Sequence, residues 1–162
     1  MQMIHAPHAF DTEREASKPK VFLAGSIEMD TAERWQDGIA EEFSAYDIVL
    51  LNPRRPVWDS GIEQSIHNPV FKEQVEWEQR GLKEADVILF YFDPKTKSPI
   101  SLLELGLFAA SGKVFVCCPE GFWRKGNVDI IAKQYGIPIF ELLPECIKAV
   151  ERCIKEKLIH TP

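Results

Sequence analysis

The sequence predicts a doubly wound α/β domain, in which helices cover both faces of a five-stranded parallel sheet. Three observations lead to this fold class. Short apolar runs alternate with longer stretches of helical periodicity from about residue 20 onward. The chain has no internal repeat, low-complexity segment or change of composition that would mark a second domain. Its 162 residues suit one domain with a substantial core, which we place at residues 20–162.

The expected strands and helices alternate along the chain. Apolar runs of strand length lie at residues 20–27, 47–51, 86–92, 113–118 and 137–140. Helical periodicity or capping residues mark residues 31–46, 69–84, 98–111, a stretch that ends at 134, and 144–157. Each β-α-β step predicts parallel strands joined by a right-handed crossover. The resulting sheet has the strand order 2-1-3-4-5, as in flavodoxin-like and Rossmann-like folds.

Residues 1–19 are polar and mixed, and we expect them to form a loose leader outside the domain. They lack the basic start and apolar centre of a signal peptide. No stretch approaches the roughly 20 apolar residues needed to cross a bilayer. The four cysteines lack the spacing of a zinc site, and we expect reduced thiols in a cytoplasmic protein.

The charge of the chain limits its partners. With 19 Lys and Arg residues against 25 Asp and Glu residues, the net charge is −6, and no basic stripe is present. This composition argues against a nucleic-acid polymer, because binding to a phosphate backbone needs clustered Lys and Arg. A single nucleotide remains possible, since backbone N–H groups can hold its phosphate. The scattered histidines form no cluster of metal ligands, so we expect no metal and no other cofactor.

One carboxylate, Glu104, lies inside the otherwise apolar helical stretch that follows the third expected strand. In one interpretation it is a nucleophile or base in the crevice at the carboxyl ends of the strands, and Gly106 leaves room for a substrate. In the other it is structural, because residues 101–104 match a capping box. If Ser98 and Pro99 begin the helix instead, Glu104 lies in its second turn and caps nothing.

A second group of candidates lies near the first and third strands. Gly25 and Ser26 follow the first strand, where they could hold an anion or form a plain tight turn. Glu78 lies on the expected helix before the third strand and is either a site residue or solvated. No Ser lies in a G-x-S-x-G setting and no Cys has a nearby His, so the carboxylates are the candidate nucleophiles.

The long loop at residues 52–68 has the length and the Pro, Arg and Trp content of an ordered binding loop. Arg54 and Arg55 in this loop could pair with a phosphate or carboxylate, or remain solvated. Trp58 in the loop and Trp123 further on could stack on a base or cover the core. We name Arg54 and Trp58 as candidate substrate-binding residues.

Four short motifs occur in a fixed order, VFLAGSI at 21–27, ADVI at 85–88, LELG at 103–106 and SGK at 111–113. In this order and spacing they resemble the nucleoside 2-deoxyribosyltransferase-like superfamily, which also includes deoxynucleoside 5′-monophosphate N-glycosidases. The segments NPRR and RKGNV look like a less characterised deoxyribosyltransferase-like branch. The resemblance covers about residues 20–139.

By this resemblance Glu104 is the nucleophile that attacks C1′ of a nucleoside. Glu78 stands eight positions before Asp86, where better-known members carry an Asp that helps in acid–base chemistry or contacts the sugar. Ser98 stands six positions before Glu104, where transferases carry an Asp that assists the base. This departure from the pattern leaves hydrolysis as well as transfer open.

The resemblance also implies binding roles and partners. Gly25 and Ser26 fall where nucleotide-cleaving members hold the sugar or the 5′-phosphate. Asn127, with its neighbours, would serve the chain's own site or that of another subunit, since related enzymes are homo-oligomers. The first hypothesis is therefore cleavage or transfer at the N-glycosidic bond of a nucleoside or nucleoside monophosphate, through a glycosyl–enzyme intermediate. The alternatives are a non-catalytic nucleotide-binding or interaction module and an NAD glycohydrolase-like activity.

Overall fold

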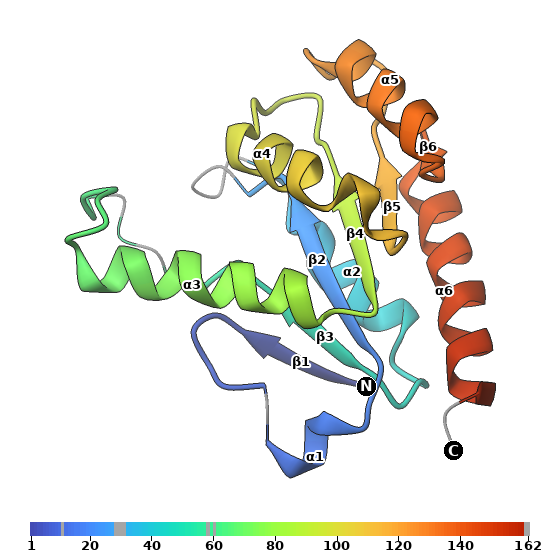
Figure 1. The fold of residues 1–162 in the computed structure, drawn as a ribbon, viewed down its shortest axis with the longest axis horizontal. Coiled ribbons are helices and arrows are strands. Elements are labelled where there is room, and N and C mark those ends of the chain that lie inside the picture. The colour runs from blue at the N-terminus through green and yellow to red at the C-terminus, as the bar shows by residue number, and fades with distance from the viewer. Residues whose placement is uncertain (11, 28–31, 58, 60, 161–162) are drawn as a thin grey trace.

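The computed structural model is a six-stranded parallel sheet with helices on both faces (Figure 1). It describes residues 1–10, 12–27, 32–57, 59 and 61–160. The strands are β1 (Gln2–His5), β2 (Lys20–Gly25), β3 (Val49–Asn52), β4 (Val87–Tyr91), β5 (Val114–Cys117) and β6 (Ile139–Phe140). They lie in the order β1-β3-β2-β4-β5-β6, and each neighbouring pair is parallel. The doubly wound α/β class expected from the sequence is confirmed.

The helices are α1 (Glu13–Ala16), α2 (Trp35–Glu42), α3 (Pro69–Glu84), α4 (Pro99–Phe108), α5 (Lys125–Tyr135) and α6 (Leu143–His160). Helix α3 has the expected bounds because Asn68 caps it, accepting hydrogen bonds from the backbone N–H groups of Val70 and Phe71. Helix α2 is shorter than the expected 31–46, and its expected start at residues 30–31 lies outside the described residues.

The expectation of five strands and a loose leader is corrected at the N-terminus. Strand β1 pairs in parallel with β3, with Met3 opposite Leu50, and so becomes the edge of the sheet. Ile4 and Phe10 are buried, and the ring of Phe10 packs edge-on against Trp77. Four residues of mixed polarity carry no strand signal of their own. They form a strand because β3 otherwise presents an unpaired edge.

Each face of the sheet has its own hydrophobic core. The first contains residues from α3, α4 and α5, among them Trp77, Leu105 and Val128. The second contains residues from α2 and α6, such as Ile39 and Val150. In Figure 1, α3 and α4 lie in front of the sheet and α2 lies behind it. Helices α3 and α4, which carry the two candidate carboxylates, therefore share one face of the sheet.

Candidate functional site

The carboxyl ends of β2 and β4 lie side by side in the middle of the sheet. From β2 the chain continues to β3 on one side, and the next strand, β4, lies on the other side of β2. A crevice at such a reversal of strand order is the usual ligand site of an open α/β sheet. The turn after β2 and the loop between β4 and α4 leave the sheet at this point.

Gly25 ends β2 and lies directly against β4, paired with Tyr91. Its φ is +127°, and an added Cβ would lie 2.1 Å from the carbonyl oxygen of Tyr91. Both the backbone conformation and the close approach require glycine. The structure therefore gives Gly25 a role in shaping the end of the strand.

Ser26 belongs to a buried cluster of three hydroxyl groups. Its Oγ lies 2.8 Å from Oγ1 of Thr96 and 2.7 Å from Oγ of Ser98, and Thr96 and Ser98 are 2.8 Å apart. Ser26 Oγ also accepts the backbone N–H of Asp93, and its side chain is fully buried. The cluster ties the turn after β2 to the loop before α4. Ser26 and Ser98 thus hold this loop in place, and their expected substrate binding stays a prediction.

Glu104 lies in the second turn of α4, which rules out the capping-box interpretation. The helix begins at Pro99, and the N–H of Leu102 bonds to the carbonyl of Ser98 at 3.0 Å. Ser98 itself adopts a left-handed conformation and makes no side-chain cap. Glu104 is 5% exposed, and among the described residues no hydrogen bond to its carboxylate is found. Such a carboxylate is costly to keep ionised.

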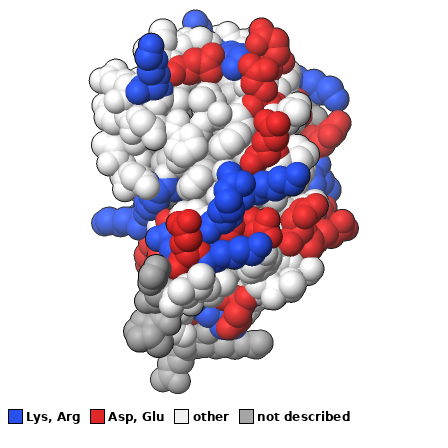
Figure 2. All heavy atoms as spheres, turned by 90° about the vertical axis from the view of Figure 1, so that its right-hand side faces the viewer, with Lys and Arg blue, Asp and Glu red and all other residues white. Residues whose placement is uncertain are grey.

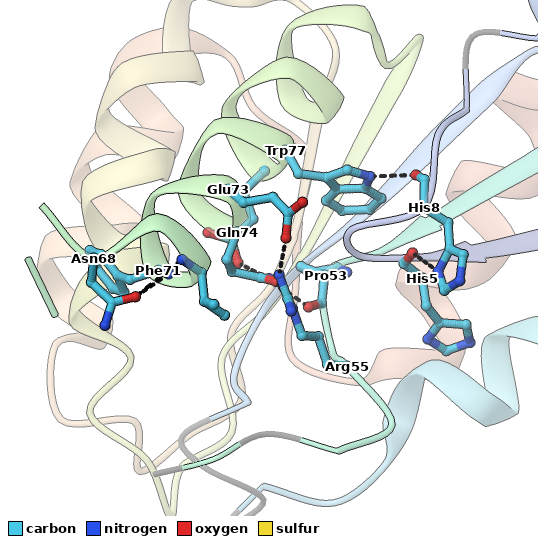
Figure 3. A network of polar contacts seen from close by, with 11 residues as sticks. His5, His8, Pro53, Arg55, Asn68, Phe71, Glu73, Gln74 and Trp77 are labelled. Carbon is cyan, nitrogen blue, oxygen red and sulfur yellow. Dashed lines mark hydrogen bonds and ion pairs between the residues drawn. The ribbon is translucent and has the colours of Figure 1, made fainter. Parts of the chain in front are cut away.

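Glu78 lies on the neighbouring helix α3 and is partly buried. Its Oε1 accepts a hydrogen bond of 2.8 Å from Nε2 of Gln74, one turn earlier on the helix. Gln74 in turn accepts a hydrogen bond from Nε of Arg55, whose Nη2 lies 3.4 Å from Glu73 (Figure 3). A chain of polar contacts therefore runs from the loop after β3 to Glu78.

The two carboxyl groups share one electrostatic environment. Burial raises the pKa of Glu104, the nearby charge of Glu78 acts in the same direction, and together they bring it to about 8. Burial also raises the pKa of Glu78, to about 7, against the opposing effects of the Gln74 hydrogen bond and the Arg55 charge. Near neutral pH the pair therefore retains a proton. Such a pair can supply one carboxylate and one acid at the same site.

Arg54 is not directed at this pair. It is 5% exposed, and its guanidinium donates hydrogen bonds to the carbonyls of Ala32 and Glu33 at 3.0 and 2.9 Å. It therefore holds the segment before α2. Arg55 is the arginine of this loop that acts on Glu78. Trp58, another expected binding residue, lies outside the described residues.

Gly106 and Asn127 line a different cavity, between α4 and α5. This cavity has a volume of about 300 Å³, and apolar side chains of both helices line it together with Arg124. At about 100° per residue, Gly106 lies on the opposite side of α4 from Glu104. An added Cβ at Gly106 would meet nothing within 4 Å. Gly106 thus opens no space beside the carboxylate, contrary to expectation, and Asn127 faces the cavity between the two helices.

Trp123 lies at the surface near this cavity. It is 44% exposed, its indole N–H donates to the carbonyl of Lys97 at 2.9 Å, and Lys97 and Arg124 lie over its ring. It therefore fastens the loop before α4 to the segment before α5.

The sequence interpretation missed Gln74 as a site residue. The sequence feature that could have identified Gln74 is its position four residues before Glu78, because this spacing places two helical side chains on one face of the helix. Nothing in the sequence distinguished Arg55 from Arg54, because both are adjacent and equally basic. Their opposite directions depend on how the loop leaves β3.

The described part of the chain shows neither a metal site nor a membrane-spanning helix. No three His, Cys, Asp or Glu residues are arranged to hold a metal ion. No helix there has both the length and the apolar character needed to cross a bilayer.

Comparison with known proteins identifies a family for the part of the chain that carries the two carboxyl groups. Residues 18–122 match the model of a family described as nucleoside 2-deoxyribosyltransferase like, a span that includes Gly25, Glu78 and Glu104. A comparison with curated protein sequences finds no match. The crystal structure of a conserved protein from Enterococcus faecalis V583 is similar, with a TM-score of 0.59 and 12% identity over 83% of this chain and 98% of that chain. At this level of identity the likeness concerns the fold.

Proposed function

The chain belongs to the nucleoside 2-deoxyribosyltransferase like family, and we therefore propose that it is an enzyme acting on the N-glycosidic bond of a nucleoside or nucleoside monophosphate. The observation that carries this proposal is the pair of interacting carboxyl groups on one face of the sheet, buried Glu104 on α4 and partly buried Glu78 on α3. Glu104 is the proposed nucleophile.

In the first proposed step the carboxylate of Glu104 forms a bond to C1′ while the bond from C1′ to the base nitrogen breaks. The electron pair passes to the base, which takes up a proton. Positive charge develops at C1′ in the transition state, and a neighbouring carboxylate stabilises it. In the second step water or an incoming base attacks C1′, and the ester bond to Glu104 breaks to release the carboxylate.

The surroundings of Glu104 suit both halves of this chemistry. Burial weakens the solvation of the carboxylate, which strengthens its interaction with a developing positive charge. The raised pKa provides a proton at neutral pH for transfer within the pair.

Transfer and hydrolysis differ in what attacks the intermediate. Where the family's transferases carry an assisting Asp, this chain has Ser98, whose hydroxyl is 4% exposed and bonded to Ser26 and Thr96. No carboxylate at this position assists an incoming base. This difference supports hydrolysis as a proposed outcome beside transfer.

The experiment is incubation with a panel of deoxynucleosides, ribonucleosides, their 5′-monophosphates and NAD, with and without a free acceptor base, followed by chromatography. Release of free base without an acceptor identifies a hydrolase, and exchange of the base identifies a transferase. Binding without turnover across the panel would contradict the proposal and indicate a nucleotide-binding module.

We further propose a homo-oligomer that binds no nucleic-acid polymer. Three apolar side chains on one face of α4, Ile100, Leu103 and Leu107, are each 59–60% exposed, and Ile130 on α5 is 67% exposed. The view in Figure 2 has a broad area without charged side chains at its upper left, while positive and negative side chains are mixed elsewhere. An apolar helix face of this kind is typical of a protein interface.

A further inference from the structure

Gln74 is held by three partners that its amide satisfies in only one orientation. Its Oε1 accepts a hydrogen bond from Nε of Arg55. Its Nε2 donates to the carbonyl of Pro53 at 2.9 Å and to Oε1 of Glu78 at 2.8 Å. Figure 3 shows Gln74 between Arg55 and the carbonyl of Pro53. The side chain is 8% exposed, so water does not readily replace these partners.

The chemistry of the partners fixes the amide. A guanidinium only donates hydrogen bonds and a backbone carbonyl only accepts them. A rotated amide would place its NH₂ group against Arg55 and its oxygen against the oxygen of Pro53, losing both bonds. With the amide fixed, one N–H of Gln74 must point at Oε1 of Glu78. That oxygen accepts this bond best without a proton, so a proton on Glu78 is favoured at Oε2.

From this geometry we infer that Gln74, locked by Arg55, is a positioning residue that favours Oε2 of Glu78 over Oε1 for the exchange of a proton with Glu104. The inference rests on the proposed function of the pair. It adds the direction of proton transfer between the two groups. Glu78 is kept as the proton acceptor, and Glu104 holds the proton until the substrate arrives.

The charges around the pair agree with this direction. The groups that act on Glu78 are Arg55, from the loop after β3, and Gln74, from its own helix, and both favour its ionised form. The group that acts on Glu104 is Glu78, whose negative charge disfavours ionisation. Glu73 is exposed and lies 3.4 Å from Nη2 of Arg55. These influences favour the ionisation of Glu78 over that of Glu104.

The proton that the base needs in the first step then comes from the Glu104–Glu78 pair itself. Glu104 gives its proton to Oε2 of Glu78 and forms the bond to C1′ as a carboxylate. The bond from C1′ to the base nitrogen breaks, and its electron pair remains on that nitrogen. The nitrogen takes the proton from Oε2, so Glu78 returns to its ionised form.

The test is a pH titration of protein labelled with ¹³C at the Glu side-chain carboxyl carbons, followed by NMR, with the Glu78 signal assigned by Glu78→Gln. We expect Gln74→Leu, which keeps the size and removes the donor, to raise the apparent pKa of Glu78 by about one unit. The pH profile of kcat should move upward with it. The matched control, Glu76→Gln, changes an exposed residue of the same helix that pairs with Lys72, and should leave both unchanged.

Arg55→Met provides a second variant if Gln74→Leu does not fold, because it leaves Gln74 in place and frees its amide. It should also raise the apparent pKa of Glu78. An unchanged Glu78 titration in either folded variant would overturn the inference. Since the titration needs no substrate, a protein without turnover that still shows the shift would contradict the proposed function and support the positioning of Glu78.

Discussion

The negative charge of Glu78 on α3 raises the pKa of Glu104 on α4, although the two residues are 26 positions apart in the sequence. The two helices cover the same face of the sheet, and burial raises the pKa of both carboxyl groups. A buried pair of this kind destabilises a fold when it ionises. Its presence beside the central strands is most simply explained by chemistry.

Glu104→Gln should reduce the release or exchange of base by about a thousandfold or more, because an amide cannot form the glycosyl ester. The measurement is turnover of the best substrate of the nucleoside panel, followed by chromatography. Glu76→Gln is the control, since Glu76 is exposed and pairs with Lys72 on the same helix. Full activity of folded Glu104→Gln would remove Glu104 from the mechanism.

The same substitution should stabilise the protein at high pH. The pKa of Glu104 rises from 4.5 to about 8 on folding, so its contribution to the free energy of unfolding is complete below pH 4.5 and is lost as the pH rises through about 8. Glu104→Gln cannot ionise, so its gain over the parent should be about 1–3 kcal/mol larger at pH 9 than at pH 6. Urea unfolding at the two pH values measures this difference. An equal effect at both would contradict the burial of an ionisable Glu104.

Gly25→Ala should destabilise the protein by several kcal/mol, roughly 3 or more, or prevent folding. The new Cβ would lie 2.1 Å from the carbonyl oxygen of Tyr91, in a backbone conformation that alanine rarely adopts. The control is Gly38→Ala inside α2, where an added Cβ meets nothing within 4 Å and the helix should gain about 0.5–1 kcal/mol. Thermal unfolding of both variants gives the comparison. Equal stability of the two would show that β2 and β4 can separate at this point.

Ser26→Ala should destabilise the protein by about 1–3 kcal/mol, because the buried N–H of Asp93 loses its acceptor and the hydroxyls of Thr96 and Ser98 lose a partner. The exposed Ser44→Ala should have no measurable effect. Urea unfolding measures both. If Ser26→Ala keeps the parent stability and instead loses affinity for 5′-monophosphates, Ser26 binds substrate and does not serve the loop.

Leu103→Glu with Leu107→Lys should shift the protein from oligomer to monomer, because these changes place charges on the exposed apolar face of α4. Native mass spectrometry and sedimentation measure the assembly. Ile159→Lys, an equally polar change at a 77% exposed residue of α6, should leave the assembly unchanged. A parent protein that is monomeric at micromolar concentration would rule out this interface.

The sequence by itself determined five of the six strands and their relative order. Apolar runs, helical periodicity and the Asn68–Pro69 start of α3 are local signals, because they arise from residues that are neighbours in the chain. The same signals placed Glu78 and Glu104 on the two helices that flank the third expected strand. The motifs that carried the family resemblance lie in these elements, and the family is confirmed.

Only the tertiary structure decided which candidate side chains meet. Residues 2–5 became a strand because β3 left an edge to pair with. Arg55 and not Arg54 acts on Glu78, Ser26 and Ser98 face each other in the interior, and Gly106 lies away from Glu104. Each of these outcomes depends on contacts between segments far apart in the sequence. Such contacts are set by packing and burial, which no local pattern of residues records.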